Sequence, residues 1–208
     1  MKDETMAAEK LDLYLLHKDE YLTPKTPMLV KIKPAKYLAI SGKGEPGGDV
    51  FAAKLSALYN VTFTIKMAQK FSGNNYKVCK LEGLWWGDKN KPDFTDEPKN
   101  TWNWKPLIRT PDFINAKHLK TVVADLREKG KSAEVSEVQL EKLNEGLCVQ
   151  MLHVGSYDEE RKTIASMLAF AEKAGLAFHG LPHEIYLSDP RRVAPQKLKT
   201  ILRMPVRR

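Results

Sequence analysis

The chain has 208 residues, of which 42% are hydrophobic and 29% charged, and its formal net charge is +8. This composition is typical of a globular protein that forms one large domain or two small ones. No run approaches the roughly 18 apolar residues of a membrane span, and the opening segment, MKDETMAAEK, lacks the pattern of a signal peptide. We therefore predict a cytoplasmic protein without a membrane segment.

The first half of the chain predicts two helices and then two strands. Residues 1–30 indicate a short helix and a proline-punctuated arm. The run KYLAISGKGEPGGD ends in a glycine-rich turn, and Asp49 is placed to cap a helix over 50–71. This turn lacks the Lys-Ser/Thr ending of a phosphate-binding loop. Strands are predicted at 76–86 and 101–108, joined by a long polar loop.

A helix and a hairpin are predicted next. Asn115 is a candidate cap for an amphipathic helix that stops at Gly130. Alternating apolar and polar residues at 137–141 and an apolar run at 147–154 are separated by the turn Asn144-Glu145-Gly146. This spacing predicts that the two segments form a β-hairpin.

The last part of the chain predicts a helix and two strands. Ser156 and Glu159 form a capping box that opens the helix, and strands follow at 181–188 and 197–206. The basic segment 191–208 contains no aromatic residue to stack on a base. Its alternation predicts one buried face and one solvated basic face, and this is favoured over direct nucleic-acid binding.

The order strand, glycine turn, helix, strand, strand occurs twice, at about 37–108 and 147–206. We therefore predict an α+β fold in which two strand-helix-strand-strand modules pack together and leave a ligand cleft between them. The modules form one domain, 31–208, after an N-terminal arm, 1–30. Cys79 and Cys148 lie in apolar runs without metal-ligand spacing, which predicts reduced thiols, no metal site and no cofactor.

All four tryptophans lie in the segment LEGLWWGDKNKPDFTDEPKNTWNWKP, residues 81–106. So much aromatic surface at the two ends of one polar loop is costly unless the rings pack on each other or on a bound molecule. Strand alternation places Trp102 and Trp104 on one face. The concentration of rings therefore favours a binding pocket over ordinary strand packing.

Two carboxylates share a strand face with an aromatic ring. Glu82 shares one with Trp86, and Glu184 shares one with Tyr186 in HEIYLSD. A carboxylate held against rings and away from water gains proton affinity, so it can serve as a general base or as the counter-charge of a cationic ligand. The alternative is that each glutamate is the solvated neighbour of an ordinary strand aromatic.

Two further residues lie near the Gly155 turn. His153 has Leu147, Val149 and Met151 on its own strand face, which favours a hydrogen-bonded core histidine over a catalyst. Tyr157 follows the turn at a helix start, where a place at the cleft and ordinary surface packing are equally supported.

Several motifs in order resemble the GyrI-like small-molecule-binding family in its stand-alone form. They are YLAISGKGEP, LEGLWW, TWNWKPLIRTPDF, EGLCVQMLHVGSYDEE and HEIYLSDPRRVAPQKLKTILRMPV, and the resemblance covers about residues 11–206. Ser156 replaces the proline of the family's Gly-Pro-Tyr turn, a change that keeps a good helix cap.

The resemblance implies a duplicated SHS2-type architecture with an aromatic-lined central cleft. Related domains take up planar, lipophilic and often cationic compounds as the effector-binding half of transcription regulators. One stand-alone branch hydrolyses cyclopropanoid DNA-alkylating natural products with an aromatic cage, and the Trp-rich strands resemble that branch. The residues carried over are the candidate cage members Trp85, Trp86, Trp102 and Trp104, the cage or hydrogen-bonding residues Tyr157 and Tyr186, the carboxylate Glu184, and the weaker candidate Glu82.

The mechanism that this resemblance implies begins with a drug stacked on the cage. Glu184 takes a proton as water attacks the cyclopropane carbon, and Tyr157 or His153 stabilises the oxyanion that becomes a phenol. Two alternatives stay open, a non-catalytic protein that binds or senses drugs and an inhibitory partner of DNA gyrase. Protein partners and oligomeric state stay open as well.

Overall fold

The computed structural model describes residues 10–89, 94 and 96–208, so the first part of the predicted arm and part of the loop after residue 86 lie outside the described residues. The helices are α1 (Leu13–Leu16), α2 (Asp49–Phe71), α3 (Ala116–Glu128) and α4 (Glu160–Lys173). The strands are β1 (Met28–Ile32), β2 (Ala35–Ala39), β3 (Gly42–Lys43), β4 (Leu81–Trp86), β5 (Asn103–Thr110), β6 (Gln139–Leu143), β7 (Gly146–Val154), β8 (Ala177–Phe178), β9 (His183–Tyr186) and β10 (Lys199–Arg207).

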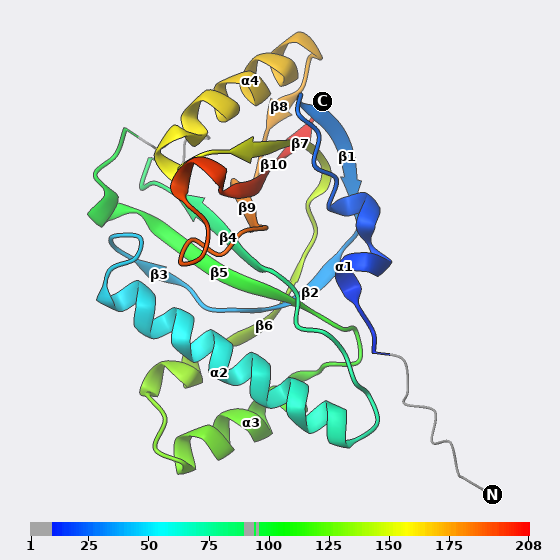
Figure 1. Cartoon of the computed structure of the whole chain (residues 1–208), viewed down its shortest axis with the longest axis vertical. Helices are drawn as coiled ribbons and strands as arrows, with labels where there is room; N and C mark the ends of the chain where they lie inside the picture. Colours follow the sequence, from blue (N-terminus) through cyan, green and yellow to red (C-terminus); the bar gives the residue numbers. More distant parts are fainter. Residues whose placement is uncertain (1–9, 90–93, 95) are drawn as a thin grey trace, which may run out of the picture.

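One antiparallel sheet runs through the molecule in the order β1-β7-β10-β9-β4-β5-β2-β6, while β3 pairs with β5 and β8 with β10. The central strands of the first module are β2-β5-β4, and those of the second are β7-β10-β9. The two modules join where β4 pairs with β9. Figure 1 shows α4 over one end of the sheet and α2 with α3 over the other. The duplicated α+β fold predicted from the sequence is therefore confirmed.

Both long helices cover the same face of the sheet. Residues paired across antiparallel strands point to one face. Leu202 of β10 pairs with Glu184 and packs in the core beneath α4. Gly83 pairs with Glu184, and Trp85, two residues further along β4, stacks on Phe51 of α2. We call this face, which carries Glu184 and Trp85, the front face, and the opposite one the back face.

The predicted hairpin over 137–154 is wrong, although both strands exist. β6 pairs with β2, and β7 pairs with β1 and β10. Because only two residues separate β1 from β2 and β6 from β7, these segments form two long paired strands that bend at the same point. Gly146, with φ of 68°, lies at this bend. Turn-forming residues mark a change of direction, but partner choice depends on contacts far away in sequence.

The predicted solvated basic face of the last strand is present only at its ends, where Lys199 and Arg207 are exposed. Every residue from 200 to 206 is buried, and the Arg203 side chain is 1% exposed. β10 lies between β7 and β9, with α4 on its front and Tyr21 of the N-terminal segment near its back. A central strand covered on both faces is buried throughout, whatever its sequence alternation.

Other boundaries differ by a few residues. The strand predicted to begin at residue 76 begins at residue 81, as β4, and Tyr76 forms only an isolated bridge with Leu11. Gly48 is the N-cap of α2, and Asp49 is its first residue. The predicted caps at Asn115 and at Ser156 are present as capping boxes, the second one opening a short 3-10 turn at Tyr157–Glu159 before α4.

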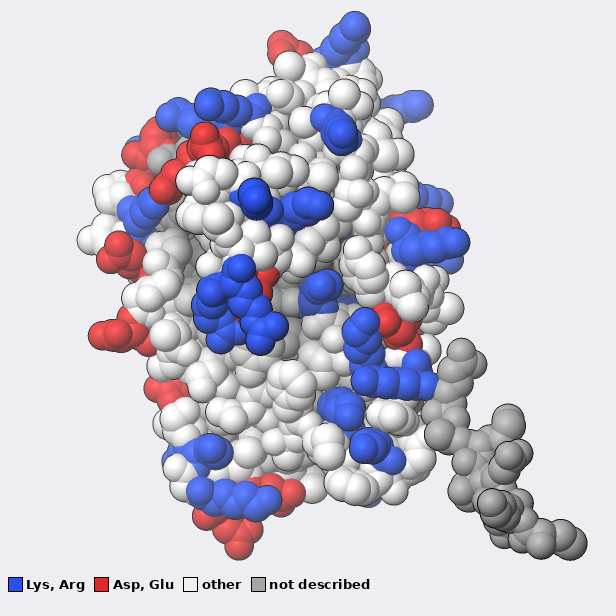
Figure 2. Space-filling model, in the orientation of Figure 1, with Lys and Arg blue, Asp and Glu red and all other residues white. Residues whose placement is uncertain are grey.

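Both cysteines are free, and none of the helices in the described ranges is long and apolar enough to span a bilayer. Figure 2 shows basic side chains spread over this view between uncharged areas, with several acidic groups along the edge.

Candidate functional site

The seam between β4 and β9 brings the two halves of the chain together on the front face. The residues that meet there are Trp85, Trp102 and Trp104 from the first half and Glu184 and Tyr186 from the second. β4 and β5 align Trp85 with Trp104, so the tryptophans of two strands lie side by side. The sequence concentrated these rings in one segment, and the register places three of the four together.

Five rings pack on one another at this seam, and we call them the aromatic group: Phe51, Trp85, Phe94, Trp102 and Trp104. Phe51 stacks on Trp85 at 5.8 Å between ring centroids and meets Trp104 edge-on at 4.9 Å. Trp85 and Trp102 are edge-to-face at 6.3 Å. Phe51 escaped the sequence analysis because a single phenylalanine in a helix's first turn gives no sign of which strand it meets.

Trp104 has a structural role within this group. Its side chain is fully buried, its Nε1 donates to the Gly44 carbonyl at 3.1 Å, and its ring lies against Gly42. An added Cβ at residue 42 would overlap the ring.

We therefore expect Gly42→Ala to lower the free energy of unfolding by about 1–3 kcal/mol, because the ring must leave its position. Urea denaturation measures this loss. The double variant with Trp104→Leu should lose less than the two single variants added together, since the smaller side chain leaves room. Strict additivity would contradict this explanation.

A hydrogen-bonded chain connects an indole with a carboxylate. Trp85 Nε1 donates to the Tyr186 hydroxyl at 2.8 Å, and that hydroxyl donates to Glu184 Oε2 at 2.7 Å. Gly83 makes the chain possible, because a Cβ there would lie 2.7 Å from the indole nitrogen and 2.9 Å from the hydroxyl. The ring of Tyr157 packs edge-on against Tyr186 at 5.9 Å and remains 41% exposed.

Glu160 is a member of this site that sequence reasoning missed. It is the first residue of α4, is 5% exposed, and lies against the carboxyl group of Glu184 and the hydroxyl of Thr200. Its Oε1 is buried without a hydrogen-bond partner among the residues that the structure describes. The available signal was its spacing with Thr163, Met167 and Ala171, which form the inward stripe of α4.

Glu160 and Glu184 form a carboxyl pair in which the pKa of each group is raised. Burial raises the pKa of both groups, and for Glu160 the charge of Glu184 raises it further. Two adjacent carboxyl groups in a dry environment cannot both ionise easily, so one stays protonated while the other is ionised. Burial and the neighbouring carboxylates also raise the pKa of Tyr157 to about 12, which keeps its hydroxyl neutral.

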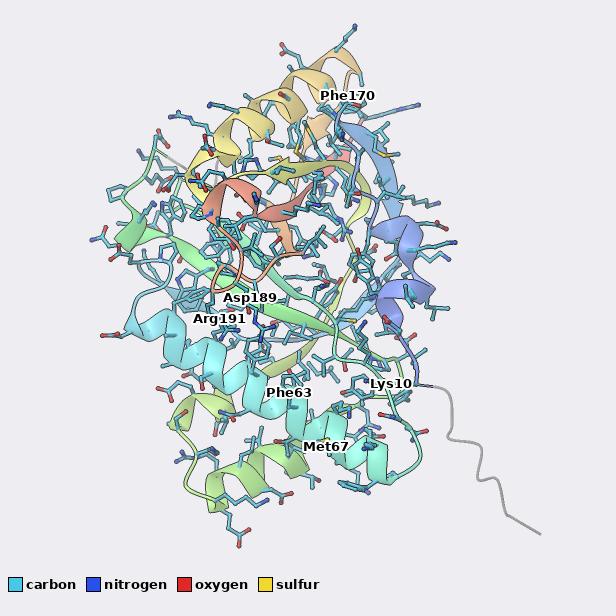
Figure 3. The ribbon with its side chains drawn as sticks, in the orientation of Figure 1. Lys10, Phe63, Met67, Phe170, Asp189 and Arg191 are labelled. Carbon is cyan, nitrogen blue, oxygen red and sulfur yellow. The ribbon has the colours of Figure 1, made fainter. Side chains whose placement is uncertain are left out.

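The rim of the site lies between α2 and the turn before α4. Figure 3 shows Asp189 and Arg191, from the segment between β9 and β10, close to α2. The Asp189 carboxylate binds the Arg191 guanidinium at 3.0 and 2.9 Å, and its charge acts on both Tyr59 of α2 and Tyr157. This segment therefore places charged groups beside the exposed rings.

Two of the predicted ligand-binding residues lie on the back face. Consecutive strand residues point to opposite faces, so Trp86 cannot accompany Trp85, and it packs instead with Leu84 and Leu181. Glu82 is fully buried, accepts a hydrogen bond from the Tyr21 hydroxyl at 3.1 Å, and lies 2.9 Å from His183 Nε2. Neither side chain reaches the front-face site.

His153 lies in the core near α4 with both ring nitrogens occupied. Nδ1 bonds Thr163 Oγ1 at 2.9 Å, and Nε2 bonds the Ser156 carbonyl at 3.0 Å. This is the hydrogen-bonded core histidine that the strand pattern favoured. Since neither nitrogen is left for a ligand, the expectation that His153 stabilises an oxyanion does not fit its position.

The back face holds a buried set of charges that we call the back-face network. Its ion pairs are His183–Glu82 at 2.9 Å, His183–Glu145 at 2.9 Å, Arg203–Glu145 at 3.1 Å and Arg109–Glu20 at 2.7 Å. Three carboxylates therefore face three cationic groups, and their formal charges cancel. Such balance is what makes charged groups tolerable in a dry interior.

This network predicts a specific pH dependence of stability. Burial alone would lower the pKa of His183, but Glu145 and Glu82 raise it to about 9 from an ordinary value of 6.5. The stabilisation from charged His183 is thus complete below the unfolded pKa and is lost as the pH rises through the folded one. We expect the free energy of unfolding to fall by on the order of 3 kcal/mol across this interval. Urea denaturation at a series of pH values tests this, and a level profile would contradict it.

A scan against protein families matches residues 25–207 to the GyrI-like small molecule binding domain. The chain belongs to the GyrI-like family. It shares 36% identity and a TM-score of 0.87 with an uncharacterized conserved protein from Listeria innocua, covering 95% of this chain and 100% of that one. A hydrolase from the same organism shares 35% identity and a TM-score of 0.86, over 96% and 100% of the two chains.

A more distant structure, the EcmrR C-terminal domain, shares the fold at 12% identity and a TM-score of 0.60, over 88% of this chain and 98% of that one. No curated protein matches the sequence.

This GyrI-like chain also has a hollow of about 160 Å³ on the back face, with mostly apolar walls and Glu145 at one side. Both oxygens of Glu145 are already bonded, to His183 and Arg203. The front face has the opposite character, since it carries packed rings and a carboxyl pair with one oxygen that has no hydrogen-bond partner among the described residues. Chemistry therefore favours the front face over the hollow.

Proposed function

We propose that this protein binds planar, lipophilic and often cationic aromatic molecules on the front face and hydrolyses cyclopropanoid DNA-alkylating compounds there. The observation that carries the proposal is the Glu160–Glu184 pair, which is bonded to Tyr186 and lies beside the exposed ring of Tyr157. Membership in a small-molecule-binding family and the likeness to a Listeria innocua hydrolase support it.

Binding rests on the rings and on the charge of the carboxyl pair. The aromatic face of Tyr157 is 41% exposed, and Trp102 and Tyr186 are partly exposed. A flat ligand that stacks there removes apolar surface from water, and the ionised member of the pair attracts a cationic group. Phe51 and Trp85 stack at an interplanar angle of 20°, and Trp85 packs edge-on against the partly exposed Trp102, so the buried rings support the exposed one from behind.

The proposed reaction adds one water molecule. The ionised carboxylate, which we assign to Glu184, takes a proton as the water oxygen bonds to a cyclopropane carbon. The ring carbon–carbon bond breaks, and its electron pair moves into the conjugated dienone. The dienone oxygen accepts a hydrogen bond from Tyr157 as its charge develops, then takes up a proton to become a phenol. Relief of ring strain and aromatisation drive the step, so one base and one donor suffice.

Mass spectrometry after incubation with a panel of aromatic compounds tests this proposal. The expected result is that a cyclopropanoid alkylator gains the mass of one water only when the protein is present. Recovery of every compound unchanged, in amounts equal to a protein-free control, would contradict the hydrolytic proposal.

Capture without conversion is a second candidate, and the ionised carboxylate beside exposed rings favours it, because this arrangement holds cations without requiring any reaction. It predicts saturable quenching of tryptophan fluorescence by a planar cationic dye that is recovered intact. Quenching without any hydrolysis across the panel would support capture over catalysis.

A further inference from the structure

The strand that carries Glu184 also carries a buried cation on its other side. His183 is the preceding residue on β9, so its side chain points to the back face while Glu184 points to the front. The His183 side chain is 0% exposed and lies 2.9 Å from a carboxylate oxygen of Glu82 and 2.9 Å from one of Glu145.

The two contacts require an imidazolium. A neutral imidazole carries one N–H and presents a lone pair on its other nitrogen. A carboxylate oxygen lies close to each nitrogen, so the neutral ring would place an unprotonated nitrogen beside an acceptor. The cation donates a hydrogen bond to Glu145 and forms an ion pair with Glu82. Arg203 shares Glu145, and Tyr37 meets the His183 ring edge-on at 6.5 Å. These contacts fix the position of the His183 ring beside β9.

We propose that His183 is a positioning residue for the front-face site: its buried positive charge keeps one carboxylate of the Glu160–Glu184 pair ionised, and its ion pairs with Glu145 and Glu82 hold the segment of β9 that carries Glu184. This inference rests on the proposed function, because it assigns a use to that carboxylate. It goes further by placing the control of the site on the opposite face of the sheet.

The charge acts through a dry sheet. No solvent layer separates adjacent residues on the two faces of β9, so screening is weak compared with a surface pair. The groups that face the carboxyl pair are Tyr186, Tyr157, Asp158 and the Thr200 hydroxyl. Asp158 opposes ionisation of the pair, whereas His183 favours it. Removing its charge leaves the back-face network with a net negative charge directly behind Glu184.

Variants that change the charge of the back-face network in opposite directions distinguish this electrostatic role from a general loss of structure. His183→Gln makes the back-face network negative, and Glu145→Gln makes it positive, because each removes one charge from a balanced set. The double variant restores balance. We expect the titration midpoint of the front-face carboxyl pair to rise by roughly one unit in His183→Gln, to fall in Glu145→Gln and to return near the native value in the double variant.

The measurement is the pH titration of side-chain carboxyl resonances in protein labelled with carbon-13 glutamate, with Glu184→Gln and Glu160→Gln used for assignment. It needs no ligand, so it reports on His183 even if the proposed function fails, a failure that dye quenching and mass spectrometry reveal separately. Shifts in the same direction in both single variants, or no shift in either, would overturn the proposal. If His183→Gln does not fold, Glu145→Gln and the double variant still decide it.

Discussion

Turnover of a cyclopropanoid substrate should fall by about 100-fold or more when Glu184 is replaced by glutamine. Glutamine keeps the size of the side chain, and its carbonyl oxygen can still accept the 2.7 Å hydrogen bond from Tyr186. It cannot take a proton from water, so the base is lost while the aromatic platform stays. Single-turnover kinetics followed by mass spectrometry measure the chemical step apart from binding.

Glu172→Gln provides the matched control, since Glu172 is an exposed glutamate on α4 in the same half of the chain. It should leave turnover unchanged. Affinity for a neutral planar dye should also stay close to native in Glu184→Gln, because stacking does not depend on the carboxylate. Undiminished hydrolysis by Glu184→Gln would show that another group is the base, and Glu160→Gln would then be the variant to measure.

Arg203→Met should lower the free energy of unfolding by about 3–5 kcal/mol, because it removes one of the two cationic partners of the buried Glu145 and leaves the network with an excess negative charge. Arg203 donates to Gln150 Oε1 at 2.8 Å and to Glu145 Oε2 at 3.1 Å, and it also bonds the Glu20 carbonyl. Methionine keeps an unbranched apolar stem but supplies no donor and no charge. Urea denaturation at neutral pH gives the change.

The control for this prediction is Arg191→Met, because the Arg191 side chain is 87% exposed and its ion pair with Asp189 lies at the surface. Exposed pairs contribute little to stability, so its denaturation midpoint should match the native one. If Arg203→Met unfolded at the same urea concentration as Arg191→Met, the back-face network would not be a stabilising feature of this fold.

Local patterns were good predictors of element type. The helix over 50–71, the cap at Asn115 and the capping box at Ser156 depend on side chains a few residues apart, and all appear in the structure. Strand alternation likewise predicted correctly that Glu184 shares a face with Tyr186. These features form through short-range hydrogen bonds and backbone geometry, which neighbouring residues control.

Such local patterns did not predict the strand partners or the buried charges. The turn at Asn144-Glu145-Gly146 bends a strand instead of reversing it, and the alternating basic residues of β10 include one that is fully buried. In both cases a distant segment decided the outcome, by supplying a strand partner for residues 139–154 or a carboxylate for Arg203.

By itself, the sequence determined the long helices and most of the longer strands, their duplicated order, the family and the collection of indoles near one loop. Only the tertiary structure decided which of those side chains meet. Pairing of Gly83 with Glu184 joins strands about a hundred residues apart and brings Trp85 to Tyr186. The packing of α4 on β7 and β10 brings Glu160 to Glu184. Such contacts gain their free energy when two faces are buried together, so no local pattern contains them.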